Sequence, residues 1–306
     1  MTDSRGQDVI DAQLHLFEAN SERHPWDPVI LSEPRYAGMR GRYAAHSASP
    51  AEVSELLDAN GVSGALVVAA SVYGNDLSYS VGAYEYAPDR FRVVARLDTS
   101  RDDVEDVVAS WAHDPAFVGF RLNLEQDDAV ERFRAGADHR ALAAAERAGL
   151  TICVLSPGRF GVFAEIARRY PELPVVLDHF GLFSIAMLDP AVTDTFGRID
   201  ELIALADIDN IFVKVSSVQL LSREPYPFND AWPHLHAVIS AFGVERLMWG
   251  SDATVFDHPY PETIDFLRDS QELGDYEKGM LLGGTLRRVW KWPQATAAPE
   301  SSATRP

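Results

Sequence analysis

The sequence is poor in cysteine and contains no long apolar run. Cys153 is the single cysteine among 306 residues, which excludes an intramolecular disulfide and a zinc site built from several thiolates. This cysteine usage predicts a cytoplasmic protein, and the N-terminal residues contain no apolar core of an export signal. No stretch approaches the roughly 18 consecutive apolar residues that a membrane-spanning helix needs.

Basic residues are also scarce relative to acidic ones. There are 27 Lys and Arg residues against 46 Asp and Glu residues, which gives a formal net charge of -19. Such a charge repels phosphate backbones and anionic lipid headgroups, so we expect no nucleic acid and no membrane surface among the partners. The expectation is a globular protein whose partner is a small-molecule substrate, and the sequence leaves open a homo-oligomer.

What the sequence does contain is a regular alternation of two patterns. Eight apolar or β-branched runs of strand length occur at residues 9–16, 65–70, 91–98, 118–124, 151–156, 174–181, 211–217 and 247–254. Between them, apolar residues recur at helical spacing in residues 51–60, 103–113, 139–149, 160–170, 191–206 and 231–242. Ser49 and Asp189, each followed by proline, are typical helix starts, and Gly149 and Gly243 are typical helix ends.

Repeated strand and helix units imply a parallel sheet, and eight of them in a chain of this length are typical of a (β/α)8 TIM barrel. We therefore expect one barrel domain over residues 9–293, an N-terminal arm at 1–8 and a disordered tail at 294–306. A doubly wound sheet with fewer strands is the alternative, but no Gly-x-Gly-x-x-Gly or Gly-x-x-x-x-Gly-Lys-Ser/Thr motif supports a nucleotide-binding sheet. The long connection at 18–50 is expected to form a cap over the barrel mouth.

Several polar residues fall near the carboxyl ends of these strands, where the active sites of such barrels lie. In the first strand, Asp11, Gln13 and His15 are spaced by two, so strict alternation predicts that all three face the inside of the barrel. In the sixth strand, the pattern leaves open whether Asp178 or His179 points inward. Polar residues of the other strands complete the candidate set: Arg121, Lys214, Ser216 and Asp252.

Four stretches together resemble one known family. They are residues 10–15 (IDAQLH), 176–181 (VLDHFG), 212–216 (FVKVS) and 246–252 (RLMWGSD). The chain resembles the amidohydrolase superfamily, and in particular its branch of pyrone-dicarboxylate lactonases, sugar lactonases and aminocarboxymuconate-semialdehyde-type decarboxylases. The resemblance implies a (β/α)8 barrel, the fold that the strand count predicts independently.

The resemblance also raises the question of whether the site binds a metal ion. The first strand of the family usually reads Asp-x-His-x-His, whereas Gln13 stands at the first of these histidines, and the fifth strand at residues 151–157 contains no histidine. An occupied metal site would be left with His15, His179 and Asp252, with Gln13 as a weak oxygen donor. Three protein ligands plus water suffice for catalytic zinc, but the loss of two imidazoles favours a site without metal. A single zinc ion is the alternative.

The function that we expect is that of a hydrolase that opens a lactone or related cyclic ester of a small organic acid. Asp252 would act as the general base for water, while His15 and His179 polarise the carbonyl and stabilise the oxyanion. The alternatives are a metal-dependent decarboxylase of the same branch and a barrel that binds a ligand without catalysis.

The remaining candidates are expected to bind the substrate. Arg121 needs a buried carboxylate partner, which is either a structural one such as Glu125 or a carboxylate of the substrate. For Lys214 the same two alternatives hold. Gln13, Ser216 and, from the cap, Trp26 complete the predicted substrate-binding residues.

Overall fold

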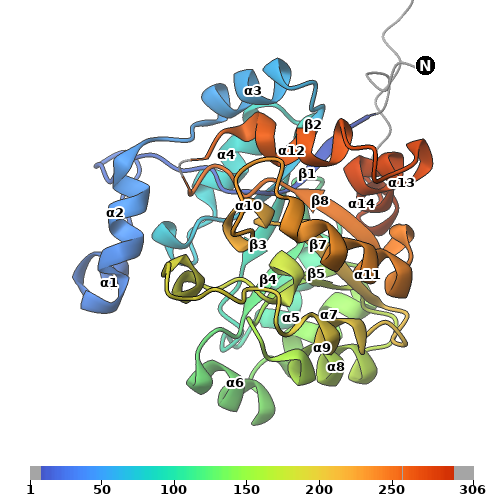
Figure 1. Cartoon of the computed structure of the whole chain (residues 1–306). Helices are drawn as coiled ribbons and strands as arrows, with labels where there is room; N and C mark the ends of the chain where they lie inside the picture. Colours follow the sequence, from blue (N-terminus) through green and yellow to red (C-terminus); the bar gives the residue numbers. More distant parts are fainter. Residues whose placement is uncertain (1–7, 257, 293–306) are drawn as a thin grey trace, which may run out of the picture.

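In a computed structural model that describes residues 8–256 and 258–292, the strands form one parallel sheet (Figure 1). The strand order follows the sequence, from β1 to β8, and the eight strands form a nearly closed barrel. The prediction of a single (β/α)8 TIM barrel is confirmed. The strands are β1 (Ile10–Leu14), β2 (Gly64–Val68), β3 (Phe91–Arg96), β4 (Phe117–Asn123), β5 (Thr151–Leu155), β6 (Val175–Leu177), β7 (Ile211–Ser216) and β8 (Leu247–Gly250).

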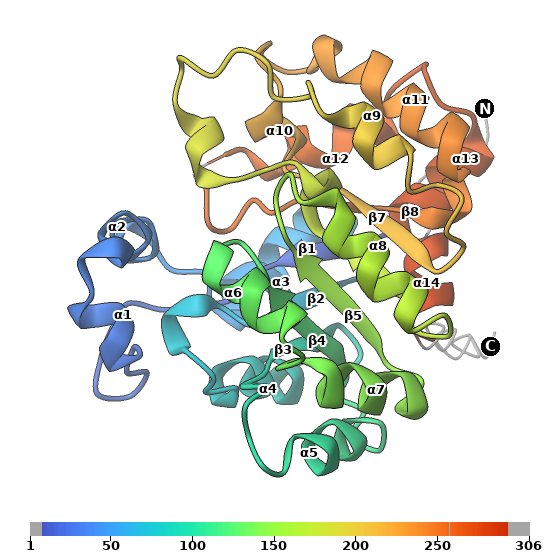
Figure 2. The same ribbon diagram turned by 90° about the horizontal axis from the view of Figure 1, so that it is seen from below.

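Helices lie between the strands and surround them (Figure 2). They are α3 (Pro50–Ala59), α4 (Ser78–Tyr86), α5 (Val104–Trp111), α6 (Asp127–Arg134), α7 (His139–Ala148), α8 (Phe160–Arg169), α9 (Ile199–Ile203), α10 (Val218–Leu221), α11 (Trp232–Phe242), α12 (Tyr260–Arg268), α13 (Asp275–Gly279) and α14 (Thr285–Val289). Within the described part of the chain, no helix combines the length and apolar character needed to cross a membrane. The predicted arm at 1–8, except for Asp8, and the predicted tail at 294–306 lie outside the described residues.

Two of the helix boundaries predicted from capping residues are confirmed. Ser49 caps α3 in a capping box with Glu52, and Gly149 ends α7 in the left-handed conformation, as the sequence predicts. The prediction of a helix at 191–206 is wrong over most of its length, because only α9 is helical there. Asp189 instead accepts a hydrogen bond from the amide of Ala191 (2.9 Å), which favours a turn over a helix.

Two apolar clusters separate the outside of the barrel from its inside. The larger one lies between strands and helices. The smaller one joins side chains from all eight strands, and it also contains Leu286, Trp290 and Trp292. Because the hydroxyl of Thr151, the first residue of β5, donates to Val289 O (3.2 Å), α14 and the residues after it cover the amino ends of the strands. An active site is therefore expected at the opposite end of the barrel, at the carboxyl ends of the strands.

The first strand departs from strict alternation. Ile10 and Ala12, which the pattern placed outward, belong to the inner cluster, and the register between β1 and β2 shifts between Asp11 and Leu14. The predicted inward position of Asp11 is therefore wrong. Its carboxylate instead accepts hydrogen bonds from the Tyr260 hydroxyl of α12 and from the amide of Ser251. A bulge, which adds one residue to a strand, reverses the faces that follow it.

The gap between β1 and β8 is bridged at the carboxyl end. Asp11 Oδ1 accepts from the Ser251 amide at 2.9 Å, and the Asp252 amide donates to Gln13 O at 2.8 Å. Burial raises the pKa of Asp11 to about 6, although the hydrogen bonds that its carboxylate accepts act in the opposite direction. The strands approach so closely that a Cβ at Gly250 would lie 2.6 Å from Gln13 Cβ.

The connection after β1 is more structured than predicted. It contains α1 (Pro28–Ser32), a 3-10 turn η2 (Pro34–Tyr36) and α2 (Ala37–Ala45), and α1 and α2 project from the barrel as an arm (Figures 1 and 2). The arm is attached to loops that follow strands. The amide of Asp27 donates to Val72 O (2.8 Å), and His46 Nε2 contacts Thr254 O (2.7 Å).

The close approach of β1 and β8 leads to a stability prediction. We expect Gly250→Ala to lower the free energy of unfolding by about 1–3 kcal/mol, the usual cost of overpacking a filled interior. Gly82→Ala is the control, because nothing lies within 4 Å of a Cβ at Gly82 in α4, where alanine favours a helix. Chemical denaturation followed by circular dichroism measures both variants, and equal unfolding free energies would contradict the close approach.

Candidate active site

Three predicted catalytic side chains meet at the carboxyl ends of the strands. His15 follows β1, His179 follows β6 and Asp252 follows β8, and all three are buried. His15 Nε2 lies 3.8 Å from Asp252 Oδ1, and His179 Nδ1 lies 3.8 Å from Asp252 Oδ2. Asp252 therefore stands between the two imidazoles, with one carboxylate oxygen toward each.

The backbone is left-handed just beyond three of the strands. The φ angle is 52° at His179, 58° at Ser217 and 53° at Asp252. Such conformations cost about 1–3 kcal/mol at non-glycine residues and persist only where the surroundings hold them. Hydrogen bonds hold two of the three conformations here. The Asp252 amide donates to Gln13 O (2.8 Å), and the His179 amide donates to Ser216 Oγ (3.3 Å). Strain of this kind is concentrated at functional sites in proteins.

The carboxylate of Asp252 has the electrostatics of a proton acceptor. Burial raises its pKa to about 7, although a hydrogen bond from Ser217 and the charge of Arg121 act in the opposite direction. Ser217 Oγ donates to Asp252 Oδ2 at 2.7 Å. A carboxylate with a pKa near neutrality exchanges protons at physiological pH, which is what a general base requires.

The hydrogen bonds of His15 determine its tautomer. Its Nδ1 lies 2.8 Å from Val68 O, which can only accept, so Nδ1 carries the proton. Burial and the charge of Arg121 lower the pKa of His15 to about 3, so the ring is neutral near pH 7. Nε2 is therefore an acceptor, and the amide nitrogen of Gln13 lies 3.3 Å from it. This corrects the expectation that His15 donates to an oxyanion.

His179 is held by two hydroxyl groups. Its Nδ1 lies 2.9 Å from Ser216 Oγ and 2.8 Å from Ser217 Oγ. Burial lowers the pKa of His179 to about 3, and the nearby charge of Asp178 does not reverse this effect. Ser217 donates its single hydrogen to Asp252, so its oxygen accepts at His179 and the proton of the neutral ring is on Nδ1. Nε2 of His179 is then an acceptor, which does not match the expected role of stabilising an oxyanion. Ser216, predicted to bind substrate, is thus placed to orient His179.

A chain of charged and polar side chains crosses the barrel below these groups. Asp178 lies between Arg121 Nε (2.7 Å) and Lys214 Nζ (2.9 Å), and Lys214 also donates to Gln13 Oε1 (2.7 Å). Burial raises the pKa of Asp178, but the charges of Lys214 and Arg121 outweigh it and hold the pKa at about 2. The partner of Arg121 is a structural carboxylate, but it is Asp178 and not Glu125.

Two of the predicted substrate-binding residues belong to this network of buried side chains. Lys214 and Gln13 are both fully buried, and they contact each other as well as Asp178 and His15. Their polar groups therefore serve to position neighbouring side chains. Of the two cations in this network, Arg121 is partly exposed, whereas Lys214 is fully buried.

Trp26 lies just before α1, in the connection after β1. It is 4% exposed, its Nε1 donates to Glu18 O (2.9 Å), and its ring packs edge-on against Tyr43. Trp26 thus packs against Tyr43 of α2. Tyr43 lies near enough to Asp252 for the charge of that carboxylate to act on its phenol. Burial and the charge of Asp252 raise the pKa of Tyr43.

The sequence analysis missed two residues at this site. Ser217 joins His179 to Asp252, and Arg96 ends β3 directly opposite Arg121 in the β3–β4 ladder. A signal for both was present. Arg96 closes an otherwise apolar strand, and Ser217 extends the polar end of β7 by one residue.

The family resemblance raises the question of a metal ion held by His15, His179, Asp252 and Gln13. Among residues 8–256 and 258–292, no three His, Cys, Asp or Glu side chains are arranged to hold one ion. One of the possible donors is engaged as well, because Lys214 occupies Gln13 Oε1. The residues as placed do not fit a metal ion, and no step proposed below uses one.

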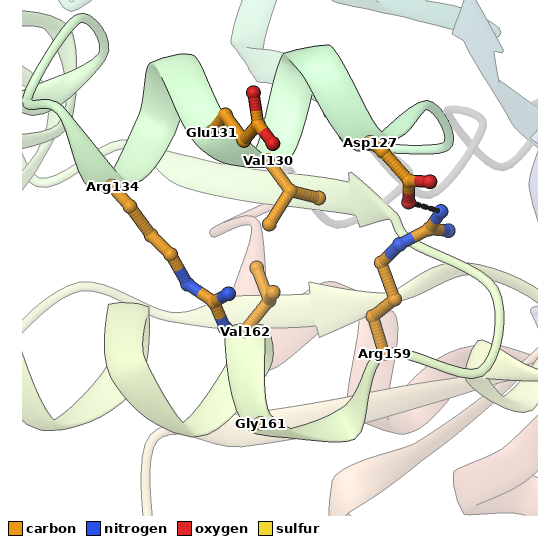
Figure 3. Close-up of a pocket in the computed structure, with 7 residues that line it drawn as sticks. All are labelled: Asp127, Val130, Glu131, Arg134, Arg159, Gly161 and Val162. Carbon is orange, nitrogen blue, oxygen red and sulfur yellow. Dashed lines mark hydrogen bonds and ion pairs between the residues drawn. The ribbon is translucent and has the colours of Figure 1, made fainter.

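A separate groove of about 400 Å³ lies between α6 and α8 (Figure 3). Val130 and Val162 line it together with charged side chains. Arg159 pairs with Asp127 at 2.6 Å across the groove. It contains none of the predicted site residues and is not a second candidate for the chemistry.

Comparison with known proteins agrees with this barrel and its polar end. The sequence profile of the family described as Amidohydrolase matches residues 10–292. An L-fucono-1,5-lactonase from Burkholderia ambifaria is 27% identical over 253 residues, which cover 79% of each chain.

Two solved structures are similar in fold. An amidohydrolase from Burkholderia multivorans with bound zinc has a TM-score of 0.76 at 22% identity, covering 94% of this chain and 100% of that one. A probable 2-pyrone-4,6-dicarboxylic acid hydrolase from Acinetobacter baumannii with citric acid bound has a TM-score of 0.70 at 19% identity, covering 93% and 99%. The chain belongs to the amidohydrolase family and is an amidohydrolase-type hydrolase.

Proposed function

We propose that this protein hydrolyses a lactone or related cyclic ester of a small organic acid, with Asp252 as the general base. The family and the lactonase relative support the reaction class. The observation that carries the assignment is the buried Asp252 carboxylate, whose pKa burial raises to about 7 and which faces His15 Nε2 across 3.8 Å.

The facing atoms suggest how water is held. The single lone pair of neutral His15 Nε2 faces the Gln13 amide nitrogen at 3.3 Å, so His15 is not free to accept from water as well. Asp252 Oδ1 is then the acceptor for a bound water molecule, whose oxygen keeps a lone pair to attack a carbonyl carbon. Asp252 orients the nucleophile and takes its proton, and His15 lies beside it at 3.8 Å from Asp252 Oδ1.

The proposed reaction has two steps. As the water oxygen bonds to the lactone carbonyl carbon, one water proton moves to Asp252 and the carbonyl electrons move to the oxygen. The ring C–O bond then breaks, and the proton on Asp252 passes to the departing alkoxide, which gives the open hydroxy acid.

Arg121 is the proposed stabiliser of the oxyanion. His179 positions the base, because its protonated Nδ1 donates to Ser217 Oγ, which in turn donates to Asp252. The guanidinium of Arg121 adds a positive charge, and Asp178 fixes its place. This arrangement supplies the electrostatic stabilisation from side chains alone.

The setting of the protein is part of the proposal. A small-molecule substrate is the proposed partner, and the cytoplasm is the proposed location. The location rests on the single cysteine, Cys153, which is buried, with burial raising the pKa of its thiol to about 11.

Replacement of the base is the first test. Asp252→Asn keeps the shape and removes the proton acceptor, so kcat for lactone hydrolysis should fall by about 10²-fold or more. Asp103→Asn removes an exposed carboxylate that pairs with Arg101 and should leave kcat unchanged. Steady-state kinetics measures both variants, with circular dichroism as the check of folding. A full rate for Asp252→Asn would mean that another residue is the base, or that the barrel only binds a ligand.

The pH dependence is a second test. Because burial raises the pKa of Asp252 to about 7, the carboxylate form is lost as the pH falls through that value. kcat/KM should therefore drop about tenfold per pH unit below about pH 7 and level off above it. The pKa values of His15 and His179 are about 3, so these residues do not titrate there. A flat profile from about pH 5 to pH 8 would contradict Asp252 as the base.

Metal removal separates the hydrolytic proposal from the metal-dependent alternatives. Exhaustive treatment with a chelator should leave the rate of lactone hydrolysis intact, since no three His, Cys, Asp or Glu side chains of the described residues are arranged to hold one ion and Lys214 occupies Gln13 Oε1. Metal analysis of protein purified without chelator should find less than one zinc per chain. Loss of activity on chelation and its return with zinc would instead support a metal-dependent hydrolase or decarboxylase.

A further inference from the structure

Arg96 has no partner of opposite charge, although it ends a barrel strand next to the site. Its Nε atom is buried without a hydrogen-bond partner, and among the described residues no ion pair joins its guanidinium. In the parallel β3–β4 ladder Arg96 is opposite Arg121, so the two side chains leave the sheet on the same face. Arg121, by contrast, pairs with Asp178.

Cations gather near Arg96. Arg121 and Lys214 both pair with Asp178, and Arg96 stands opposite Arg121 outside these ion pairs. Burial lowers the pKa of Arg96, and the charge of Arg121 lowers it further. This cluster of cations stands out in a chain with a net charge of -19.

Among the described residues, no ion pair compensates Arg96. The charge of Asp27 acts on it favourably, but no ion pair joins the two, and the Asp27 carboxylate caps α1 through the amide of Val29 (2.7 Å). A guanidinium that is partly removed from water is unfavourable unless an anion binds it. An anion from outside the chain is therefore what the position lacks.

We propose that Arg96 binds a carboxylate of the substrate and is the residue that selects carboxylated over uncharged lactones. This inference rests on the proposed function and assigns the substrate class of the same site. The planar guanidinium matches a carboxylate with two parallel hydrogen bonds. The role expected for Arg121 thereby passes to Arg96, because Arg121 pairs with Asp178, whereas the buried Nε of Arg96 has no hydrogen-bond partner and no ion pair joins its guanidinium among the described residues.

The test compares two γ-lactones that differ in one group. Paraconate carries a carboxylate on the ring, and β-methyl-γ-butyrolactone carries a methyl group in its place. Titration calorimetry measures binding of each to the Asp252→Asn variant, in which turnover is suppressed. Adding Arg96→Met should weaken paraconate at least about tenfold, as expected for hydrogen bonds to a charged group, and leave the methyl lactone unchanged.

Two further variants serve as controls. Arg147→Met in the same background removes an arginine that is 62% exposed and pairs with Glu105, and it should leave paraconate binding unchanged. Arg96→Lys keeps the charge but loses the planar fork, so its affinity should be lower than that of the chain with Arg96 and higher than that of the Arg96→Met variant.

Thermal unfolding distinguishes a binding role from a structural one. Because Arg96 has no partner to lose, Arg96→Met should leave the Tm unchanged or raise it, whereas a structural arginine would lower it. Equal paraconate affinity with and without Arg96→Met, or no paraconate binding before that substitution, would overturn the inference. If paraconate binding depends on Arg96 but the wild-type protein opens no lactone, the proposed hydrolysis fails and the carboxylate subsite stands.

Discussion

The rest of the site depends on one buried carboxylate, Asp178, held between two cations. A charge buried inside a barrel is tolerated only when it is paired, and Asp178 is paired with Arg121 of β4 and Lys214 of β7. Lys214 then has a donor left for Gln13 of β1, and the Gln13 amide reaches His15. One ion-pair network thus joins strands on different sides of the barrel and positions the imidazole of His15, which follows β1.

Closure of the barrel positions the base in the same way. The two strands that meet last in the sequence, β1 and β8, are joined by the Asp11 carboxylate and by the amide of Asp252 itself. The bond that closes the barrel is therefore also the bond that holds Asp252 in a left-handed conformation. The strain at this residue is offset by a hydrogen bond that the fold needs anyway, so the position of the base and the integrity of the barrel are coupled.

The sequence predicts the barrel because the strand and helix periods repeat eight times, a signal that survives errors in single elements such as the helix expected at 191–206. It predicts which polar side chains meet at the candidate site because strand ends are easy to find. Side-chain direction is harder, since the register of β1 shifts between Asp11 and Leu14, and the alternation counted back from Gln13 and His15 therefore misplaces Ile10 and Ala12, which face inward. The partners of charged residues are harder still. Arg96 and Ser217 have meaning only through neighbours on other strands, and period and spacing carry no information about those neighbours.

The tautomer of His15 links these observations to the chemistry. A neutral imidazole that donates to Val68 O must present a lone pair at Nε2, and the carboxylate opposite also presents lone pairs. The Gln13 amide faces that lone pair, so each ring nitrogen of His15 has a partner and the ring is held in one orientation beside Asp252. Gln13 stands at the first of the two histidines that the family usually has in this strand, and it links His15 to the Lys214 ammonium. The imidazole next to Asp252 is therefore positioned by the same ion-pair network that holds Asp178.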